Sequence, residues 1–256
     1  MIDFTKSKQY TLSIRLSTDG FSFSIYNPIH DDSLSIIEKE IDPSLSLTAN
    51  LKAAFHESEF LSHPYKRVNI MIADKRFTIV PLELFEEEQA ELLFYHNHQK
   101  RENEAVHHNI LQKNNVVIVF GIDKSAYTFL KEQYPEAHFY SQSTPLIDYF
   151  SVKSRLGNSK KMYVSIRREG IDIYCFEKGH ILLANSFECM QTEDRIYYLL
   201  YVWKQLEFDQ KRDELHLTGA LPDKEGLMNG LKKFILQVFI MNPATNIDMQ
   251  ALLTCE

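Results

Sequence analysis

Apolar and polar residues alternate on both sides of two turns that lie far apart in the chain. One segment, residues 10–27 (YTLSIRLSTDGFSFSIYN), turns at Gly20, and the other, residues 162–176 (MYVSIRREGIDIYCF), turns at Gly170. Alternation with a period of two is typical of strands that bury one face, and two such runs around a glycine turn predict a β-hairpin. Both segments carry Ser-Ile-Arg before the turn, which indicates that one architecture is repeated.

The pattern after each hairpin predicts further strands and amphipathic helices. Strands are indicated by short apolar runs and helices by a period near 3.6 residues, with Ser46 or Thr48 available to cap the first helix. A polar stretch through His108 is expected to be solvated. The expected strands are 33–41, 67–74, 76–81, 115–122, 137–142, 179–189, 214–221 and 235–241, and the expected helices are 46–61, 83–99, 123–134, 144–150, 192–208 and 223–234.

The two halves share one order of elements, which is strand, strand, strand, helix, strand, helix, strand. The first half carries extra material around residues 75–112. Residues 151–161, SVKSRLGNSKK, combine serine, glycine and asparagine with four positive charges, which is typical of a boundary. We therefore expect a first half at 1–150, a linker at 151–161 and a second half at 162–256.

Composition and charge exclude several classes of partner. The 256 residues include 28 basic and 35 acidic side chains, and the net charge of -7 gives no general attraction to nucleic acid or anionic lipid. The N-terminal residues do not resemble a signal peptide, and no apolar run approaches a membrane span, so we expect a cytoplasmic protein. Cys175, Cys189 and Cys255 form no CxxC pair, which argues against a disulfide framework and a cysteine zinc site.

The order of elements resembles that of the actin-like ATPases of the ribonuclease H-like superfamily. Residues 115–134 (NVVIVFGIDKSAYTFLKEQY) and 137–150 (AHFYSQSTPLIDYF) are similar to the segment that links the two halves in heat-shock chaperones and division actins. More narrowly, the chain resembles a small bacterial family of uncharacterised proteins with this fold. The resemblance implies an α/β fold in which each half is a mixed five-stranded sheet with flanking helices.

The resemblance also implies where nucleotide chemistry would be found. In actin-like ATPases each hairpin opens with an aspartate that helps to hold magnesium-bound water, and small residues follow whose N–H groups approach the phosphates. Here Arg15 and Arg167 stand at the two aspartate positions. Ser17 replaces an expected glycine, and Gly170 is the one glycine left of the second cluster. A guanidinium cannot ligate magnesium, so both substitutions work against the metal.

Four more positions belong to this candidate site. Gly219, in LHLTGALPD, matches the glycine turn that supports adenosine in the family, although a second glycine is missing. Asp123 corresponds roughly in position to the residue that orients the attacking water in the family. The alternative explanation of this aspartate is that it caps the following helix. Asp19, beside Gly20 in the first turn, and Asp172, after the second turn, are the acids that would have to replace the missing ligands.

The two arginines have two interpretations. In the first, Arg15 and Arg167 are strand-end residues whose stems pack while their heads reach water. In the second, both project into the cleft between the halves and bind a phosphate or carboxylate without a metal. The second interpretation depends on their symmetric placement in the repeat.

Other polar clusters are expected to be structural or solvated. On a helix, histidines two residues apart do not face one another, so the histidines of residues 95–108 indicate a polar insert rather than a metal site. The acidic run 85–93 is a solvated face or a docking surface for a basic partner. The basic run from Lys153 to Lys161 is expected to be a connector, with contact to nucleic acid as the alternative. The histidines concerned are His96, His98, His107 and His108.

Three classes of function follow. We prefer a non-catalytic interaction or scaffold module, a pseudo-enzyme without cofactor that binds a protein partner through residues 75–112 or the cleft. The alternative is an ATPase that binds ATP and magnesium through displaced ligands. A nuclease is the third class, and it needs a carboxylate on the first strand, which is missing. A homodimer stays open. Tyr197 and Tyr201 share one side of their helix and are expected to lie in the core, whereas they would anchor an interface if part of the helix were exposed.

Overall fold

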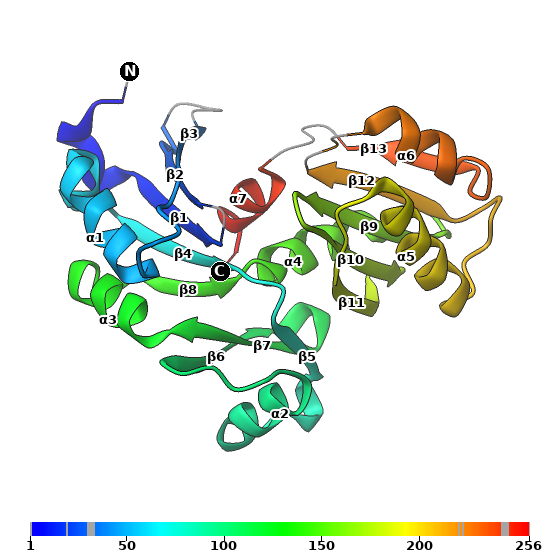
Figure 1. The fold of residues 1–256 in the computed structure, drawn as a ribbon, viewed down its shortest axis with the longest axis horizontal. Coiled ribbons are helices and arrows are strands. Elements are labelled where there is room, and N and C mark those ends of the chain that lie inside the picture. The colour runs from blue at the N-terminus through cyan, green and yellow to red at the C-terminus, as the bar shows by residue number, and fades with distance from the viewer. Residues whose placement is uncertain are drawn as a thin grey trace. The chain divides into compact units, whose positions relative to one another are not determined.

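The computed structural model of the chain describes residues 2–18, 20–29, 34–219, 221, 223–241 and 246–255 (Figure 1). The chain forms two compact units: residues 1–110 with 116–144, and residues 111–115 with 145–256. Each unit contains a five-stranded mixed sheet flanked by helices, and the two sheets share one strand order. This arrangement is the predicted fold class.

The first sheet consists of the first hairpin, a third antiparallel strand and two parallel strands. Its strands are, in spatial order, β3 (Leu34–Lys39), β2 (Gly20–Tyr26), β1 (Thr11–Ser17), β4 (Arg67–Ala73) and β8 (His138–Ser141). Strand β1 pairs antiparallel with β2 and parallel with β4, which confirms the predicted hairpin. Leu12, Ile14 and Leu16 of β1 are buried in the core of this unit, because alternate side chains of a strand share one face.

Two helices share the apolar core of the first sheet. These are α1 (Leu47–Glu57) and α3 (Lys124–Gln133), which contribute Leu51, Ala54, Ala126 and Leu130 to the same apolar cluster as β1. Ser46 caps α1 by accepting a hydrogen bond from the N–H of Ala49 at 3.2 Å, so one of the two predicted caps is confirmed. Two short 3₁₀ helices, η1 (Phe4–Gln9) and η2 (Glu59–Ser62), lie in the same unit.

The extra material of the first unit forms a small sheet of its own. The strands are β5 (Phe77–Pro81), β7 (Val116–Asp123) and β6 (Glu104–Leu111) in spatial order, and α2 (Ala90–Asn97) packs against them. Phe94 of α2 is fully buried among Val80, Val117 and Val119. Since β7 pairs with β5, this extra sheet extends beyond residue 112 and includes residues up to 123.

Two predictions for the extra sheet are wrong. The helix expected at 83–99 is α-helical only at Ala90–Asn97, and 3₁₀ turns at Leu82–Leu84 and Glu87–Gln89 precede it. No side chain caps these turns or the start of α2. The stretch through His108 is not a solvated insert, because it contains the strand β6, in which most side chains are half-buried or buried.

The second sheet repeats the order of the first. Its strands are β11 (His180–Glu188), β10 (Gly170–Glu177), β9 (Lys160–Arg167), β12 (Glu214–Gly219) and β13 (Gln237–Ile240). Strand β9 pairs antiparallel with β10 and parallel with β12, so the second hairpin is confirmed as well. Met162, Val164 and Ile166 enter a core that also contains Trp203 of α5 (Thr192–Gln205) and Leu227 of α6 (Lys224–Leu231).

Helix α4 (Ser143–Ser154) packs against the opposite face of the second sheet, where the ring of Phe150 stacks on Tyr163 with centroids 4.4 Å apart. Residues 151–154 of the expected linker therefore belong to this helix, and β9 already begins at Lys160. A short helix that the sequence pattern did not predict, α7 (Ile247–Leu252), follows near the C-terminus. Among the described helices, none has the length and apolar character needed to cross a membrane.

Candidate functional site

The ends of the two hairpins are where the sequence places the candidate site. In the first hairpin Ser17 pairs with Gly20, and in the second hairpin Arg167 pairs with Gly170. Two residues connect the strands in each case, so Ser17, not Arg15, is the counterpart of Arg167. The two Ser-Ile-Arg motifs are thus displaced by two residues relative to their turns, and the symmetry that suggested a shared anion site is not present in the register.

In the first hairpin, Arg15 lies two residue pairs before the pair that closes the turn. It faces Ser22 across the pair, and its Nη2 donates a hydrogen bond to the Ser22 hydroxyl at 2.8 Å. Arg15 and Ser17 are both half-buried. Asp19, the acid that would replace a lost magnesium ligand, lies outside the described residues.

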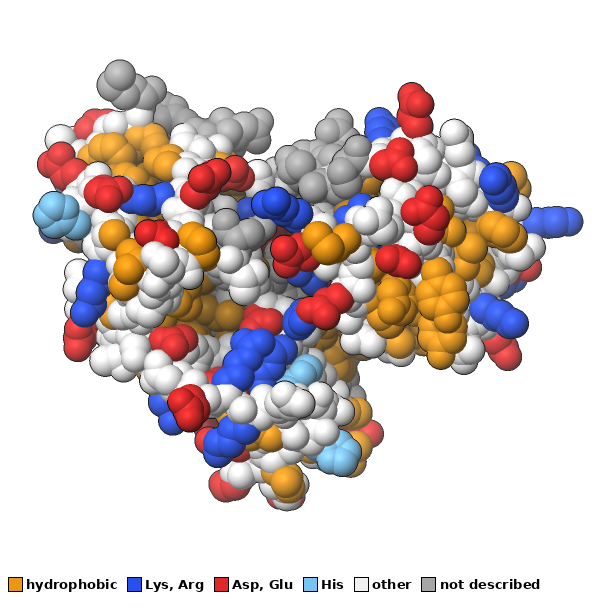
Figure 2. Space-filling view, viewed as in Figure 1, with side chains coloured by type: hydrophobic (Ala, Val, Ile, Leu, Met, Phe, Trp, Pro, Cys, Tyr) orange, Lys and Arg blue, Asp and Glu red, His pale blue; other side chains and the backbone are white. Residues whose placement is uncertain are grey.

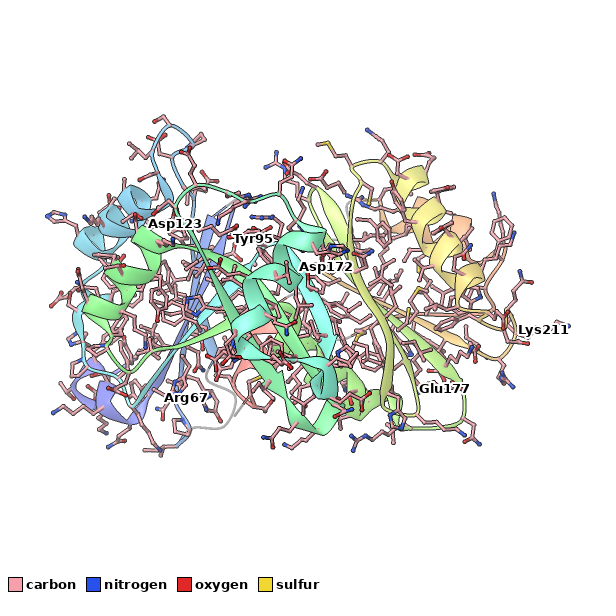
Figure 3. The ribbon with its side chains drawn as sticks, turned by 90° about the horizontal axis from the view of Figure 1, so that it is seen from below. Arg67, Tyr95, Asp123, Asp172, Glu177 and Lys211 are labelled. Atoms are coloured by element: carbon pink, nitrogen blue, oxygen red, sulfur yellow. The ribbon has the colours of Figure 1, made fainter. Side chains whose placement is uncertain are left out.

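In the second hairpin, Arg167 and Asp172 form a two-pronged ion pair. Arg167 donates from Nε to Oδ2 and from Nη2 to Oδ1 of Asp172, both at 2.8 Å. The Ser186 hydroxyl donates a further hydrogen bond to Oδ1. The Asp172 side chain (Figure 3) is only 5% exposed, so water scarcely reaches its carboxylate. Its hydrogen bonds therefore come from these three protein donors. The sequence singled out both residues but did not predict that they bind each other.

A further arginine, which the sequence pattern did not indicate, donates hydrogen bonds to the backbone of the second turn. Arg195 of α5 is 3% exposed, and its Nη2 donates to the carbonyl oxygens of Arg168 at 3.1 Å and Arg167 at 3.4 Å. Burial raises the pKa of the neighbouring Cys189 thiol, and the guanidinium of Arg195 acts in the opposite direction. The sequence could have indicated that Arg195 is buried, because it lies four residues before Leu199 on the apolar side of this helix.

The glycines at this end of the second sheet are required by close backbone contacts. A Cβ atom at Gly170 would lie 2.5 Å from the carbonyl oxygen of Phe187. At Gly219 the backbone has φ +88°, and a Cβ atom would lie 2.2 Å from the carbonyl oxygen of Ile166. Packing between strands therefore explains both glycines without any ligand.

Asp123, in the first unit, is a helix cap (Figure 3). Its Oδ1 accepts the N–H of Ala126 at 2.8 Å at the start of α3, and its Oδ2 accepts the Asn103 amide at 2.8 Å. The Thr48 hydroxyl is 3.4 Å from Oδ1. The capping explanation given above therefore accounts for this residue.

The four histidines of the extra sheet have separate surroundings. His98 of the α2 end lies 3.1 Å from the carbonyl oxygen of Phe77, His107 packs on Tyr127, and His108 packs on Phe85. His96 is exposed. Burial lowers the pKa of His98 and of His107. Within the described part of the chain, no three His, Cys, Asp or Glu side chains are grouped so that they could hold a metal ion.

Two five-stranded sheets of one order, each opened by a hairpin, define the actin-like ATPase fold. A protein from Bacteroides thetaiotaomicron VPI-5482, described as having an actin-like ATPase fold and unknown function, is 84% identical over 100% of both chains, with a TM-score of 0.96. The family model described as protein of unknown function (DUF3822) matches residues 1–238, and the chain belongs to this family.

More distant solved structures share the fold alone. In the PilM-PilN type IV pilus biogenesis complex, a chain with 10% identity gives a TM-score of 0.58, with 96% of this chain and 94% of that chain covered. The ethanolamine utilization protein EutJ from Carboxydothermus hydrogenoformans gives 0.52 at 9% identity, with 96% and 90% covered. Among curated proteins, no relative matches the chain.

Proposed function

We propose that this protein is a non-catalytic interaction module that keeps the actin-like fold without its magnesium-nucleotide chemistry. The observation that carries the proposal is the pairing of Asp172 with Arg167. A carboxylate that accepts three hydrogen bonds, two of them from a guanidinium, has little capacity left for a divalent cation.

The remaining residues at the hairpin ends do not fit a magnesium-bound triphosphate. Magnesium requires oxygen ligands in nearly octahedral geometry, and Arg15 presents fixed positive charge on the first sheet. Close packing against Ile166 explains the glycine at position 219, and capping of α3 explains the aspartate at position 123, so neither residue requires a nucleotide. The combination supports a binding function over phosphoryl transfer.

The test is titration calorimetry with ATP and magnesium, followed by a phosphate-release assay. We expect no binding below about 1 mM, a Kd that corresponds to roughly -4 kcal/mol, and no hydrolysis. Arg168→Ala is the matched control for Arg167→Ala, because Arg168 is exposed in the same turn. Magnesium-dependent ATP binding that is lost in Asp172→Asn would establish the alternative ATPase with displaced ligands.

The same titrations without metal address direct anion binding. An anion at Arg167 has to displace a buried carboxylate that already holds the guanidinium by two hydrogen bonds. We therefore expect ATP and small dicarboxylates to give no heat in the wild type, in Arg15→Ala or in Arg167→Ala. Heat that disappears in either variant would show that the arginines are ligands.

We further propose that a basic protein partner binds the extra sheet and that the protein works in the cytoplasm. The residues before and along α2 combine the acids of 86–88 with Leu84 and Leu92, which are 66% and 70% exposed. Exposed leucines beside acids suit a basic, amphipathic partner. All three cysteines are free and buried, in keeping with a reducing compartment.

The partner surface is tested with Leu84→Ala/Leu92→Ala in a pull-down from cell lysate. Leu156→Ala in the second unit is the matched control, because that side chain is 71% exposed. We expect the double variant, but not the control, to lose partners. A deletion of 86–108 is less informative, since it removes α2 and more than half of β6 together with Glu104, which forms a buried ion pair with Arg76.

A further inference from the structure

Helix α5 exposes two large aromatic side chains to solvent. Its inner side is closed by Leu199, Val202 and Trp203, which are at most 4% exposed. On its outer side Tyr197 is 63% exposed and Tyr201 is 49% exposed, so the expectation that both lie in the core is wrong, and their rings stack with centroids 6.2 Å apart. Hydrophobic side chains gather over this helix in Figure 2. Tyrosines displayed on a rigid helix have the composition of an interface anchor.

Charged residues close this stripe at both ends. Glu193 precedes the tyrosines and Lys204 follows them, at spacings of i, i+4, i+8 and i+11, and this spacing keeps all four on one side of the helix. Both charged side chains are exposed, and neither forms an ion pair with any residue that the structure describes. An acid in the first turn and a base in the last turn also suit the helix dipole, which explains the charges but not the exposed tyrosines.

Along α5 this stripe runs acid, tyrosine, tyrosine, base. A second copy of the helix that runs in the opposite direction therefore presents a base to the acid and tyrosines to the tyrosines. The pair of tyrosines and the pair of charges are both centred close to Leu199, so a two-fold axis through this point serves both. In an antiparallel arrangement, Glu193 meets Lys204 of a second copy, and Tyr197 meets the second copy's Tyr201. The two charge contacts lie about 16 Å apart along the helix, at 1.5 Å per residue.

We propose that α5 is the contact surface of a symmetric homodimer in which two copies pack this helix antiparallel. The interface is isologous, because the same four residues serve both copies. A single helix face lies at the small end of interface sizes, so the dimer forms reversibly, with a Kd on the order of 10 µM. This inference does not depend on whether nucleotide is bound.

The experiment is sedimentation velocity of the full chain from about 1 µM to 500 µM, a range that brackets the expected Kd. We expect a monomer–dimer equilibrium that Tyr197→Ala/Tyr201→Ala weakens at least about tenfold. Leu156→Ala, which removes a 71% exposed leucine that lies outside α5, is the matched control and leaves the equilibrium unchanged. Trp203 fluorescence checks that α5 remains folded in every variant, since this is the one tryptophan of the chain.

Charge reversal tests the antiparallel geometry itself. Glu193→Lys alone and Lys204→Glu alone each place like charges at both ends of the interface, so each variant sediments as a monomer. An equimolar mixture of the two places a lysine opposite a glutamate at both ends, and we expect heterodimers to form with the wild-type Kd. A monomeric wild type at every concentration, single variants that dimerise like the wild type, or a mixture that stays monomeric would each overturn the proposal.

Discussion

The buried ion pair between Arg76 and Glu104 allows a sharp prediction about the extra sheet. The two side chains are 7% and 6% exposed, and Arg76 also donates to the carbonyl oxygen of Gln99. The guanidinium lies over the ring of Phe94 at 5.1 Å, and a Cβ atom at Gly121 would lie 2.5 Å from the Glu104 carboxylate. The pair is therefore enclosed by α2, β6 and β7.

Glu104→Gln keeps the shape of the side chain and removes its charge. The arginine then remains buried without a counter-charge, which costs about 3–5 kcal/mol when a buried pair is broken at one partner. This loss is comparable to the whole stability of many domains, which is about 5–15 kcal/mol. Replacing both residues by apolar ones, as in Arg76→Met/Glu104→Leu, removes the uncompensated charge and is expected to cost no more than about 2 kcal/mol.

Hydrogen exchange measured by mass spectrometry locates the effect. We expect faster exchange in peptides from 77–123 in Glu104→Gln, while Trp203 fluorescence keeps its urea midpoint because that residue lies in the core of the second unit. Glu102→Gln, two residues away and exposed, is the control and leaves exchange unchanged. If Glu104→Gln exchanges like the wild type, or if the double variant loses more protection than the single one, the electrostatic account is wrong.

Other predictions concern single sites. Gly219→Ala should cost about 2–4 kcal/mol in urea unfolding, because its Cβ would meet the Ile166 carbonyl, and a wild-type midpoint would contradict this. Asp123→Ala should lose about 1–2 kcal/mol by removing a helix cap, and Asp123→Ser should restore part of it. Burial lowers the pKa of His216 below its usual 6.5, so its contribution to stability is complete above that pH and is lost as the pH falls below it. His216→Gln should weaken this pH dependence. Burial also raises the pKa of Cys175, so a thiol reagent should label it only after denaturation.

Most of the fold could be predicted because its strands alternate regularly. In β1 the apolar residues Leu12, Ile14 and Leu16 are separated by polar ones, and the same period recurs in β9. The strand β6 escaped detection because both of its faces carry polar letters. Asn109, for example, accepts the N–H of Ser141 and donates to the carbonyl oxygen of Phe139. Periodicity of hydrophobicity cannot detect a strand that is held by side-chain hydrogen bonds.

The candidate site was harder to predict, since it depends on partners and not on patterns. Arg167 and Asp172 are five residues apart on opposite strands of a hairpin, and their contact follows only when the register of the turn is known. Matching the Ser-Ile-Arg letters placed Arg15 and Arg167 at equivalent positions, whereas the turns place them two residues apart. A displacement of two residues keeps each side chain on the same face of the sheet and changes its neighbours, so the alternation of apolar and polar residues does not reveal it.

The same geometry explains how an actin-like fold can be kept whichever residues occupy the nucleotide positions. Leu12 and Ile14 face the core that stabilises the first unit, while Ser13 and Arg15 alternate with them on the other face of β1. Burial of apolar area therefore does not depend on which charge occupies the second face. Selection for the fold constrains one set of alternate positions and selection for the ligand constrains the other. A match in fold to ATPases thus leaves the reaction undetermined, and the contacts of Arg167 are the better guide.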